Sequence, residues 1–287
     1  MVSLGVDIGG SKIALSGRIA RRTVFAAQFR IDVETEPRAV LDEMLEYLRA
    51  RIDQHGAIDS VGIASAPNLD ANGVVTRWPN HPRWERTPVA AAFASLATHK
   101  ILWCDDGTAA TIADADALST PNLIHLSFGT GVGGGIFFEN RVLADRELGH
   151  LMVYPDGLAC SCGRAGCLQA YVSARSLQHH LDGSTGGDAE VEWYEQAVTA
   201  TAICVSNLVE LFRSPWVTFS GGLSSRFPGL ASDVDRRLQD RYLKSPLTPP
   251  RVMLSPHGSN ASLQGAHLIA AGNETLQTMT CSNLWLR

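Results

Sequence analysis

The sequence predicts an α/β protein made of two related domains with a cleft between them. The chain has 287 residues, which is enough for two domains of ordinary size. A pattern of strand, Gly-rich turn and strand also occurs twice, at residues 2–19 and again at residues 122–138, each time followed by alternating helices and strands. We therefore expect an N-terminal domain at residues 1–107 and a C-terminal domain at residues 108–287.

The first half begins with a predicted three-stranded meander. A helix follows at Pro37, because apolar residues from Val40 to Ile52 recur at helical spacing and proline favours the first turn of a helix. Residues 108–118 are rich in alanine and predict another helix. The remaining predicted elements are strands at 2–8, 12–19, 23–31, 61–64 and 101–104, and a helix at 88–97.

The second half repeats this order. Val198, Ala202, Val205, Val209 and Phe212 mark one face of a long helix. No clear pattern follows Asn273. The other predicted elements are strands at 122–128, 132–138, 216–219 and 252–254, and helices at 233–243 and 262–271.

Composition excludes several classes of partner. The net charge is −5 and the chain contains no run of Lys or Arg, which argues against nucleic acid. No apolar run approaches the length of a membrane span, and no basic-flanked apolar stretch marks a secretory signal. Clustered thiols without such a signal favour a reducing compartment, so we expect a cytoplasmic protein.

The segment from Glu147 to Tyr171, which we name the zinc loop, holds a candidate metal site. One imidazole and three thiolates form a complete tetrahedral ligand set for a structural zinc, which would have no open position for chemistry. The alternatives are buried apolar cysteines or disulfides. Three of the six cysteines fall within eight residues, beside two glycines, which favours the metal. The predicted ligands are His150, Cys160, Cys162 and Cys167.

Such a metal site would fix the polar residues on either side of it. Glu147 lies three residues before the first ligand, and Gln169 lies two residues after the last. The remaining cysteines, Cys104, Cys204 and Cys281, are isolated and carry no predicted role.

Three glycine turns predict a nucleotide site. The first turn, DIGGSK at residues 7–12, follows a strand and exposes backbone N–H groups to an anion. Asp7 is suited to hold Mg²⁺ through water, since Mg²⁺ keeps most of its hydration. Ser11 and the neighbouring amides are suited to contact phosphate. Taken alone, this turn is equally compatible with a simple tight hairpin.

The second turn, FGTGVGGG at residues 128–135, has five glycines within seven positions, so its backbone can approach a phosphate closely. It lacks the lysine of the P-loop and is not followed by a helix, which excludes the two common nucleotide fingerprints. A Gly-rich hairpin is the alternative. The third turn, SGGLS at residues 220–224, suits the adenosine end of a nucleotide. Together the three turns predict ATP in the interdomain cleft.

These motifs resemble the ROK family, named for its repressors, open reading frames and kinases. DIGGSK resembles the family's first phosphate motif, GTGVGGG its second, SGGLS its adenosine motif, and CSCGRAGC its zinc motif. The resemblance implies an actin-like ATPase fold with two ribonuclease H-like domains and ATP-dependent phosphorylation of a sugar, usually at the 6-hydroxyl of a hexose. Because the first phosphate motif begins within ten residues of the start, without the helix-turn-helix extension of the repressors, we expect a kinase.

The resemblance also implies the site residues. Asp106 takes the place of the catalytic base, although its position before a helix also suits an N-cap. Asn80, between two prolines, could alternatively be a turn residue. The implied sugar contacts are Asn80, Asp105, Asp106, Glu147, His150 and Gln169. The implied ATP contacts are Asp7, Gly9, Gly10, Ser11, Lys12, Gly129, Thr130, Gly131, Gly133, Gly221 and Gly222.

Three departures from the family pattern fall around the sugar. Gln169 stands where the kinases usually have Glu, Asp105 stands where they usually have Asn, and the segment between Gly135 and Glu147 is short. A carboxylate gained at Asp105 favours an ammonium group through a charge-assisted hydrogen bond. An amino sugar such as 3-amino-3-deoxyglucose (kanosamine), or an aminated cyclitol, is therefore an alternative to a glucose-like hexose. A C7-cyclitol, which shares the ring hydroxyl pattern but lacks the ring oxygen, is a separate alternative. A sugar sensor without catalysis is the rival from another class.

The sequence thus predicts a cytoplasmic sugar 6-kinase with a structural Zn²⁺ and with Mg²⁺ bound alongside ATP. Its partners are ATP and a small sugar, without nucleic acid or membrane. The resemblance also allows a homodimer.

Overall fold

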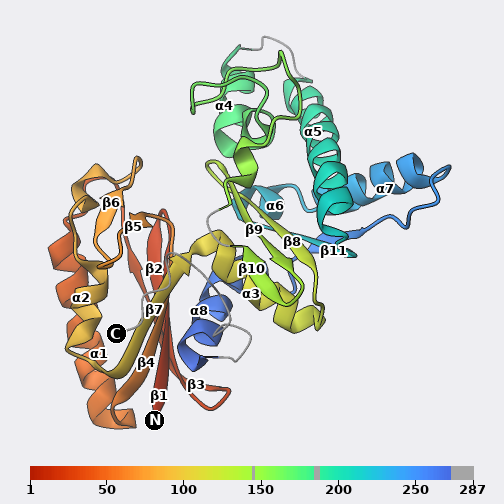
Figure 1. Cartoon of the computed structure of the whole chain (residues 1–287). Helices are drawn as coiled ribbons and strands as arrows, with labels where there is room; N and C mark the ends of the chain where they lie inside the picture. The colour runs from red at the N-terminus through yellow and green to blue at the C-terminus, as the bar shows by residue number, and fades with distance from the viewer. Residues whose placement is uncertain (144–145, 184–187, 273–287) are drawn as a thin grey trace. The chain divides into compact units, whose positions relative to one another are not determined.

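The computed structural model describes residues 1–143, 146–183 and 188–272, and the chain divides into two compact units (Figure 1). The first unit contains Met1–Ala113 and the chain from Ser262, and the second contains Asp114–Ala261. These bounds differ from the expected division at residue 107, because helix α8 (Ala261–Ala271) packs within the first unit. A Cβ added to Gly62 would lie 1.9 Å from the carbonyl oxygen of Ala266, so glycine permits this close approach.

The first unit is built on a five-stranded sheet in the order β3-β2-β1-β4-β7. The first three strands are antiparallel neighbours, as the predicted meander requires, and β1, β4 and β7 are parallel. The register sets Asp7 opposite Ala64, and Ser65 opposite Asp105, so the carboxyl ends of these parallel strands share one edge. The strands are β1 (Val2–Ile8), β2 (Lys12–Ile19), β3 (Arg22–Arg30), β4 (Ile58–Ser65) and β7 (Ala97–Asp105).

Helix α1 (Pro37–His55) begins at the expected proline and buries Val40, Met44 and Leu48 in the core of the first unit. Helix α2 (Val89–Ala94) is shorter than predicted, because the chain enters β7 at Ala97. The other elements of this unit's core region are β5 (Asn68–Leu69), β6 (Val75–Arg77) and η1 (Pro82–Trp84). Helix α3 (Asp106–Leu118) begins in the first unit and ends in the second.

The second unit has its own five-stranded sheet, in the order β10-β9-β8-β11-β12. Helix α5 (Ala189–Phe212) buries Val198, Ala202 and Val205 in the core of this unit, which confirms the predicted helical face. The strands are β8 (Leu123–Phe128), β9 (Val132–Phe138), β10 (Arg141–Leu143), β11 (Trp216–Ser220) and β12 (Arg251–Leu254). The remaining elements are η2 (Leu148–His150), η3 (Leu168–Ala170), α4 (Ala174–Gly183), α6 (Gly222–Arg226), α7 (Leu230–Tyr242) and η4 (Gly258–Asn260).

Helix α4 and strand β10 were not expected from the sequence. β10 has only three residues, and it is defined by its pairing with β9 rather than by a local pattern. The tail after Asn273 and Cys281 lie outside the described residues. None of the helices that the structure describes combines the length and the apolarity that a membrane crossing needs.

Candidate active site

The first turn is held on both sides by hydrogen bonds. The backbone N–H of Gly9 donates to the carbonyl of Lys12 (3.0 Å), and that of Ile31 donates to the carbonyl of Ser11 (3.0 Å). Nε2 of His81 lies 2.6 Å from the carbonyl oxygen of Gly10. Since a trans peptide is planar, fixing the Gly10 carbonyl directs the N–H of Ser11 to the opposite side.

His81 was missed by the sequence analysis. Its ring is almost fully buried and packs 4.4 Å, between centroids, from Trp78. Its Nδ1 lies 3.0 Å from the carbonyl oxygen of Asp32, so the ring joins two backbone segments. The available signal was its position directly after Asn80, between two prolines. Asn80 itself is exposed and is brought beside the first turn by this neighbour.

Two acidic side chains interact at the carboxyl edge of the first sheet. Asp7 belongs to β1, and Asp106 is the first residue of α3, directly after β7. The pKa of Asp7 is raised to about 7, mainly by burial and then by the negative charge of Asp106, while Lys12 opposes the shift. A pKa displaced this far by burial and a like charge is typical of functional sites and of sites that receive a cation.

Asp105 caps the helix that carries Asp106. Its carboxylate accepts a hydrogen bond from the backbone N–H of Thr108 (2.7 Å) and a short one from the hydroxyl of the same residue. This is the N-cap pattern, in which a side-chain oxygen satisfies an otherwise unpaired N–H of the first helical turn. The N-cap function that the sequence allowed for Asp106 therefore belongs to Asp105, and the carboxylate of Asp105 is fixed in orientation.

The second and third turns meet in the second unit. Gly221 has a positive φ of 94°, and a Cβ there would lie 2.3 Å from the carbonyl oxygen of Phe128, so glycine is needed for the contact. A pocket of about 410 Å³ opens beside both turns. It is lined by Gly129, Thr130, Ala174, Leu177, Gln178, Gly222, Leu223 and Arg226.

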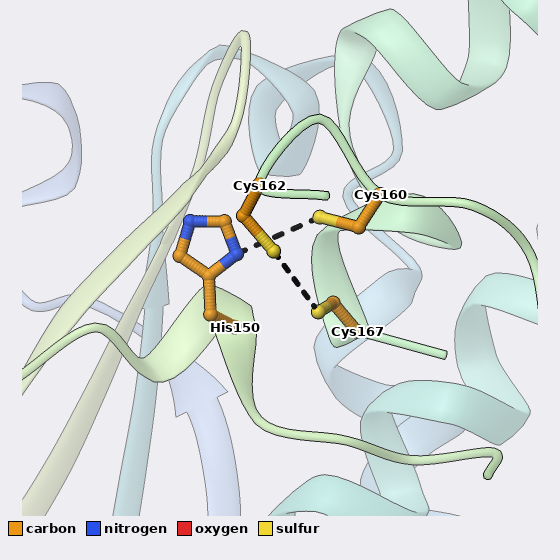
Figure 2. Close-up of side chains that lie close together, drawn as sticks. All are labelled: His150, Cys160, Cys162 and Cys167. Atoms are coloured by element: carbon orange, nitrogen blue, oxygen red, sulfur yellow. Dashed lines mark hydrogen bonds between the residues drawn. The ribbon is translucent and has the colours of Figure 1, made fainter. Parts of the chain in front are cut away.

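The four predicted zinc ligands converge (Figure 2). Their ligand atoms all lie within 4.8 Å of one another. Nδ1 of His150 lies 3.6 Å from Sγ of Cys160, and the Sγ atoms of Cys162 and Cys167 lie 3.7 Å apart. A tetrahedral zinc has bonds of about 2.3 Å to sulfur and about 2.0 Å to nitrogen. Its ligand atoms are then about 3.5 Å apart for a nitrogen and a sulfur, and about 3.8 Å apart for two sulfurs. The sulfur separation is too long for a disulfide, which needs about 2.05 Å.

The thiols differ in protonation when no metal neutralises them. The backbone N–H of Arg164 lowers the pKa of Cys162 to about 6, while burial raises the pKa of Cys167 to about 12. A bound Zn²⁺ requires both as thiolates, so metal binding would release protons. The residues present therefore fit a structural zinc, which would supply stability to the loop and no open coordination position.

The zinc loop packs against the second turn. A Cβ added to Gly149 would lie 2.2 Å from the carbonyl oxygen of Val132, so η2, which ends at His150, packs directly on this turn. Gln169 also contacts Val132, with Oε1 3.4 Å from the backbone nitrogen. Glu147 is exposed at the start of η2.

The predicted site residues thus form two groups, each described within its own unit. The first unit contains the first turn with Asp7, Asn80, Asp105 and Asp106. The second unit contains the second and third turns with Glu147, His150 and Gln169.

Known proteins resemble this chain in sequence and in fold. A sequence model of the ROK family matches residues 3–273. Kanosamine kinase of Amycolatopsis mediterranei is 30% identical over 300 aligned residues, which cover 94% of this chain and 97% of that protein. The crystal structure of a ROK hexokinase from Thermus thermophilus has a TM-score of 0.77 and 26% identity, covering 96% of this chain and 99% of the other.

A ROK family glucokinase from Streptomyces griseus, solved with glucose and AMPPNP, has a TM-score of 0.74 and 22% identity, covering 95% of this chain and all (100%) of that one. At this identity the likeness concerns the fold, and it confirms the expected actin-like ATPase fold together with the Thermus structure.

Fold and relatives define the class of this protein, an ATP-dependent sugar kinase. Because the family match spans nearly the whole chain, the protein belongs to the ROK family.

Proposed function

We propose that this protein transfers the γ-phosphoryl group of ATP to the 6-hydroxyl of a hexose or hexose-like sugar, with Asp106 as the general base. The observation that carries the proposal is the interaction of Asp106 with Asp7, whose pKa burial and this charge raise to about 7. Two carboxylates at one strand edge, beside a glycine turn, suit a reaction that needs a base and a cation held near phosphate.

Each group has a distinct part in this reaction. Asp106 accepts the proton of the attacking hydroxyl, a contribution worth about 10² to 10⁴ in rate. Asp7 binds, through water, the Mg²⁺ that accompanies ATP and neutralises phosphate charge. The backbone N–H groups of the first and second turns bind phosphate oxygens. The predicted ATP contacts are Gly9, Gly10, Ser11, Lys12, Gly129, Thr130, Gly131, Gly133, Gly221 and Gly222.

We place the adenosine part of ATP in the 410 Å³ pocket of the second unit. Leu177 and Leu223 supply apolar surface for the base, and Gly129 and Gly222 bring backbone close to the sugar and phosphate end. The polar residues Gln178 and Arg226 complete its lining.

The sugar hydroxyls are bound by amide, carboxylate and imidazole groups in this proposal. His150 would bind zinc through Nδ1, the nitrogen that faces Cys160, which leaves Nε2 to contact the sugar. The predicted sugar contacts are Asn80, Asp105, Asp106, Glu147, His150 and Gln169. The cytoplasmic location and the homodimer also stay predictions.

The test is a coupled ADP-release assay with Mg-ATP and a panel of sugars. The panel contains glucose, mannose, glucosamine, N-acetylglucosamine, N-acetylmannosamine, 3-amino-3-deoxyglucose and a C7-cyclitol. Asp106→Asn should lower kcat by a factor of about 10² to 10⁴. Asp116→Asn is the matched control, because it makes the same charge change at an exposed position of the same helix. Equal activity of the two variants would contradict Asp106 as base.

A second candidate substrate is an amino sugar such as 3-amino-3-deoxyglucose. It is supported by the carboxylate of Asp105 and by the 30% identity to a kanosamine kinase. Asp105→Asn separates charge from structure, since asparagine is also a good N-cap and can still accept from Thr108. The variant should lower the ratio of amino-sugar to glucose turnover. An unchanged ratio would contradict a role of this charge in specificity.

The panel also separates the rival functions. Turnover of the cyclitol alone would identify a cyclitol kinase, which shares the ring hydroxyl pattern without the ring oxygen. Sugar binding without ADP release on any member would favour a sugar sensor.

A further inference from the structure

The side chain of Gln169 contacts two parts of the second unit at once. Its Nε2 lies 3.1 Å from the hydroxyl oxygen of Ser161 and 3.5 Å from Sγ of Cys160, both in the zinc loop. Its Oε1 accepts a long hydrogen bond of 3.4 Å from the backbone N–H of Val132, in the second turn. Both ends of the amide are thus engaged by protein groups, one of them a predicted metal ligand.

The backbone around Gln169 reinforces this connection. The N–H of Ala174, five residues later, donates to the carbonyl of Gly129 at 2.9 Å. A Cβ added to Gly131 would lie 3.0 Å from Oε1 of Gln169, so the glycine leaves room for the amide. The close packing of Gly149 on Val132 adds a further contact from the other end of the zinc loop. The second turn is therefore held at several points, by the zinc loop and by the first residue of α4.

An amide can do here what a carboxylate cannot. The three thiolates outweigh the charge of one Zn²⁺, so the site carries net negative charge. The N–H of Gln169 donates toward Cys160 and stabilises that charge, as outer partners of metal ligands commonly do. The Glu that usually occupies this position in the family has no N–H and would add a negative charge.

We propose that Gln169 is a positioning residue through which zinc binding fixes the second turn for the phosphates of the nucleotide. This role rests on the proposed use of that turn by ATP. Zinc and nucleotide then stabilise each other through the amide, because coupling between two binding sites is reciprocal. The role is separate from the direct sugar contact implied by the family resemblance, and it predicts effects that need no sugar.

The first experiment measures zinc release to a metallochromic chelator from the purified zinc-loaded protein. Gln169→Glu should release zinc about 10 to 100 times faster than the wild type, the usual effect of changing an outer partner of a metal ligand. Gln54→Glu is the matched control, because it makes the same chemical change at an exposed position of α1. Release from Gln169→Glu at the wild-type rate would overturn the proposal.

The second experiment is a thermodynamic cycle on nucleotide binding. The Kd of Mg-AMPPNP is measured by calorimetry for wild type and Gln169→Ala, each with zinc and after chelation, with circular dichroism to verify folding. Zinc removal should weaken binding about tenfold in the wild type and less than about threefold in the variant. Mg-AMPPNP should slow zinc release from the wild type but not from the variant.

The outcomes separate this inference from the proposed function. An equal effect of zinc removal in both proteins, or no effect in either, would overturn the coupling through Gln169. Neither experiment uses sugar turnover, so a protein that phosphorylates none of the sugars could still show the coupling. If the wild type binds no nucleotide, the proposed function fails, and the zinc-release comparison alone decides whether Gln169 supports the metal.

Discussion

The two glycine turns proposed to bind phosphate are held in different ways. In the first unit, the buried ring of His81 holds the first turn, which begins at Asp7, whose pKa is raised mainly by burial. In the second unit, the second turn is held by the amide of Gln169 and by the backbone of the zinc loop. The first arrangement concentrates unfavourable charge, whereas the second satisfies it. Removing the charge of Asp7 should therefore stabilise the first unit, whereas removing a zinc ligand or Gln169 should take away support in the second.

The largest effect is expected from losing a zinc ligand. Cys167 is buried, and Cys167→Ser should weaken zinc binding by more than about 100-fold, because a direct ligand matters more than an outer partner. Metal content by atomic emission and limited proteolysis would measure the change, with new cleavage expected between Glu147 and Tyr171. Cys204→Ala is the control, since this buried cysteine lies in α5. Zinc retained in Cys167→Ser would refute the predicted ligand set.

Asp7→Asn should affect activity and stability in opposite directions. Removing a preorganised charge next to a transferring phosphoryl group should cost about 10² to 10³ in kcat. The folded pKa of Asp7 is about 7 and its ordinary value is 3.8, so the folded protein keeps a proton that the unfolded chain has lost in this window. The free energy of unfolding therefore falls as pH rises from 3.8 to 7.

Asparagine does not ionise, so the free energy of unfolding of Asp7→Asn should not fall over this pH range. Urea unfolding at pH 8 should show the variant more stable, by an amount on the order of a few kcal/mol. The advantage should disappear near pH 4, which provides the internal control. A variant no more stable than wild type at pH 8 would contradict the strained carboxylate.

His81→Phe tests the support of the first turn. Phenylalanine keeps a ring against Trp78 but removes the ring nitrogens that lie beside the carbonyl oxygens of Asp32 and Gly10, so the hydrogen bond that holds the turn is lost, at a cost of about 0.5 to 1.5 kcal/mol. The KM for ATP should rise about tenfold, with a smaller change in kcat, because the turn binds ATP rather than acting as base. His99→Phe, an exposed substitution in the same unit, is the control. A kcat effect without a KM effect would contradict this role.

Local patterns predicted most of the fold. The strand limits of β1 and β2 agree with the prediction, because β1 ends at the first turn, β2 begins there, and both strands are largely buried. Helix α1 begins at Pro37 and buries the predicted face. Strand β10 was not predicted, since its three residues are defined by their pairing with β9. The membership of α8 in the first unit is likewise a long-range property.

The metal cluster was predictable because its ligands lie close in the sequence, and the four ligand atoms do converge. The roles of His81 and Gln169 were not predictable in the same way. His81 bonds to carbonyls 49 and 71 residues away, and Gln169 bonds to an amide 37 residues away. Such partners come from folding and leave no spacing pattern in the sequence. The contributions of the individual ATP and sugar residues stay predictions.

The smallest expected effect concerns a second titrating group of the first unit, with the opposite pH dependence. The pKa of His267 is lowered from 6.5 to about 3, mainly by burial and then by the charge of Arg18, and its Nε2 lies 2.7 Å from the hydroxyl oxygen of Ser16. Below pH 6.5 the imidazole of His267 binds a proton in the unfolded chain but stays neutral in the folded protein. The free energy of unfolding therefore decreases as pH falls toward 3.

His267→Gln should remove this loss. Between pH 6.5 and pH 5 the wild type should lose about 2 kcal/mol more than the variant in urea unfolding. Since Asp7 destabilises the protein as pH rises and His267 destabilises it as pH falls, the double variant should show a flatter pH profile than either single variant. Parallel profiles for wild type and His267→Gln would mean that the imidazole is accommodated in its charged form. The acid sensitivity of the first unit would then have to come from another group.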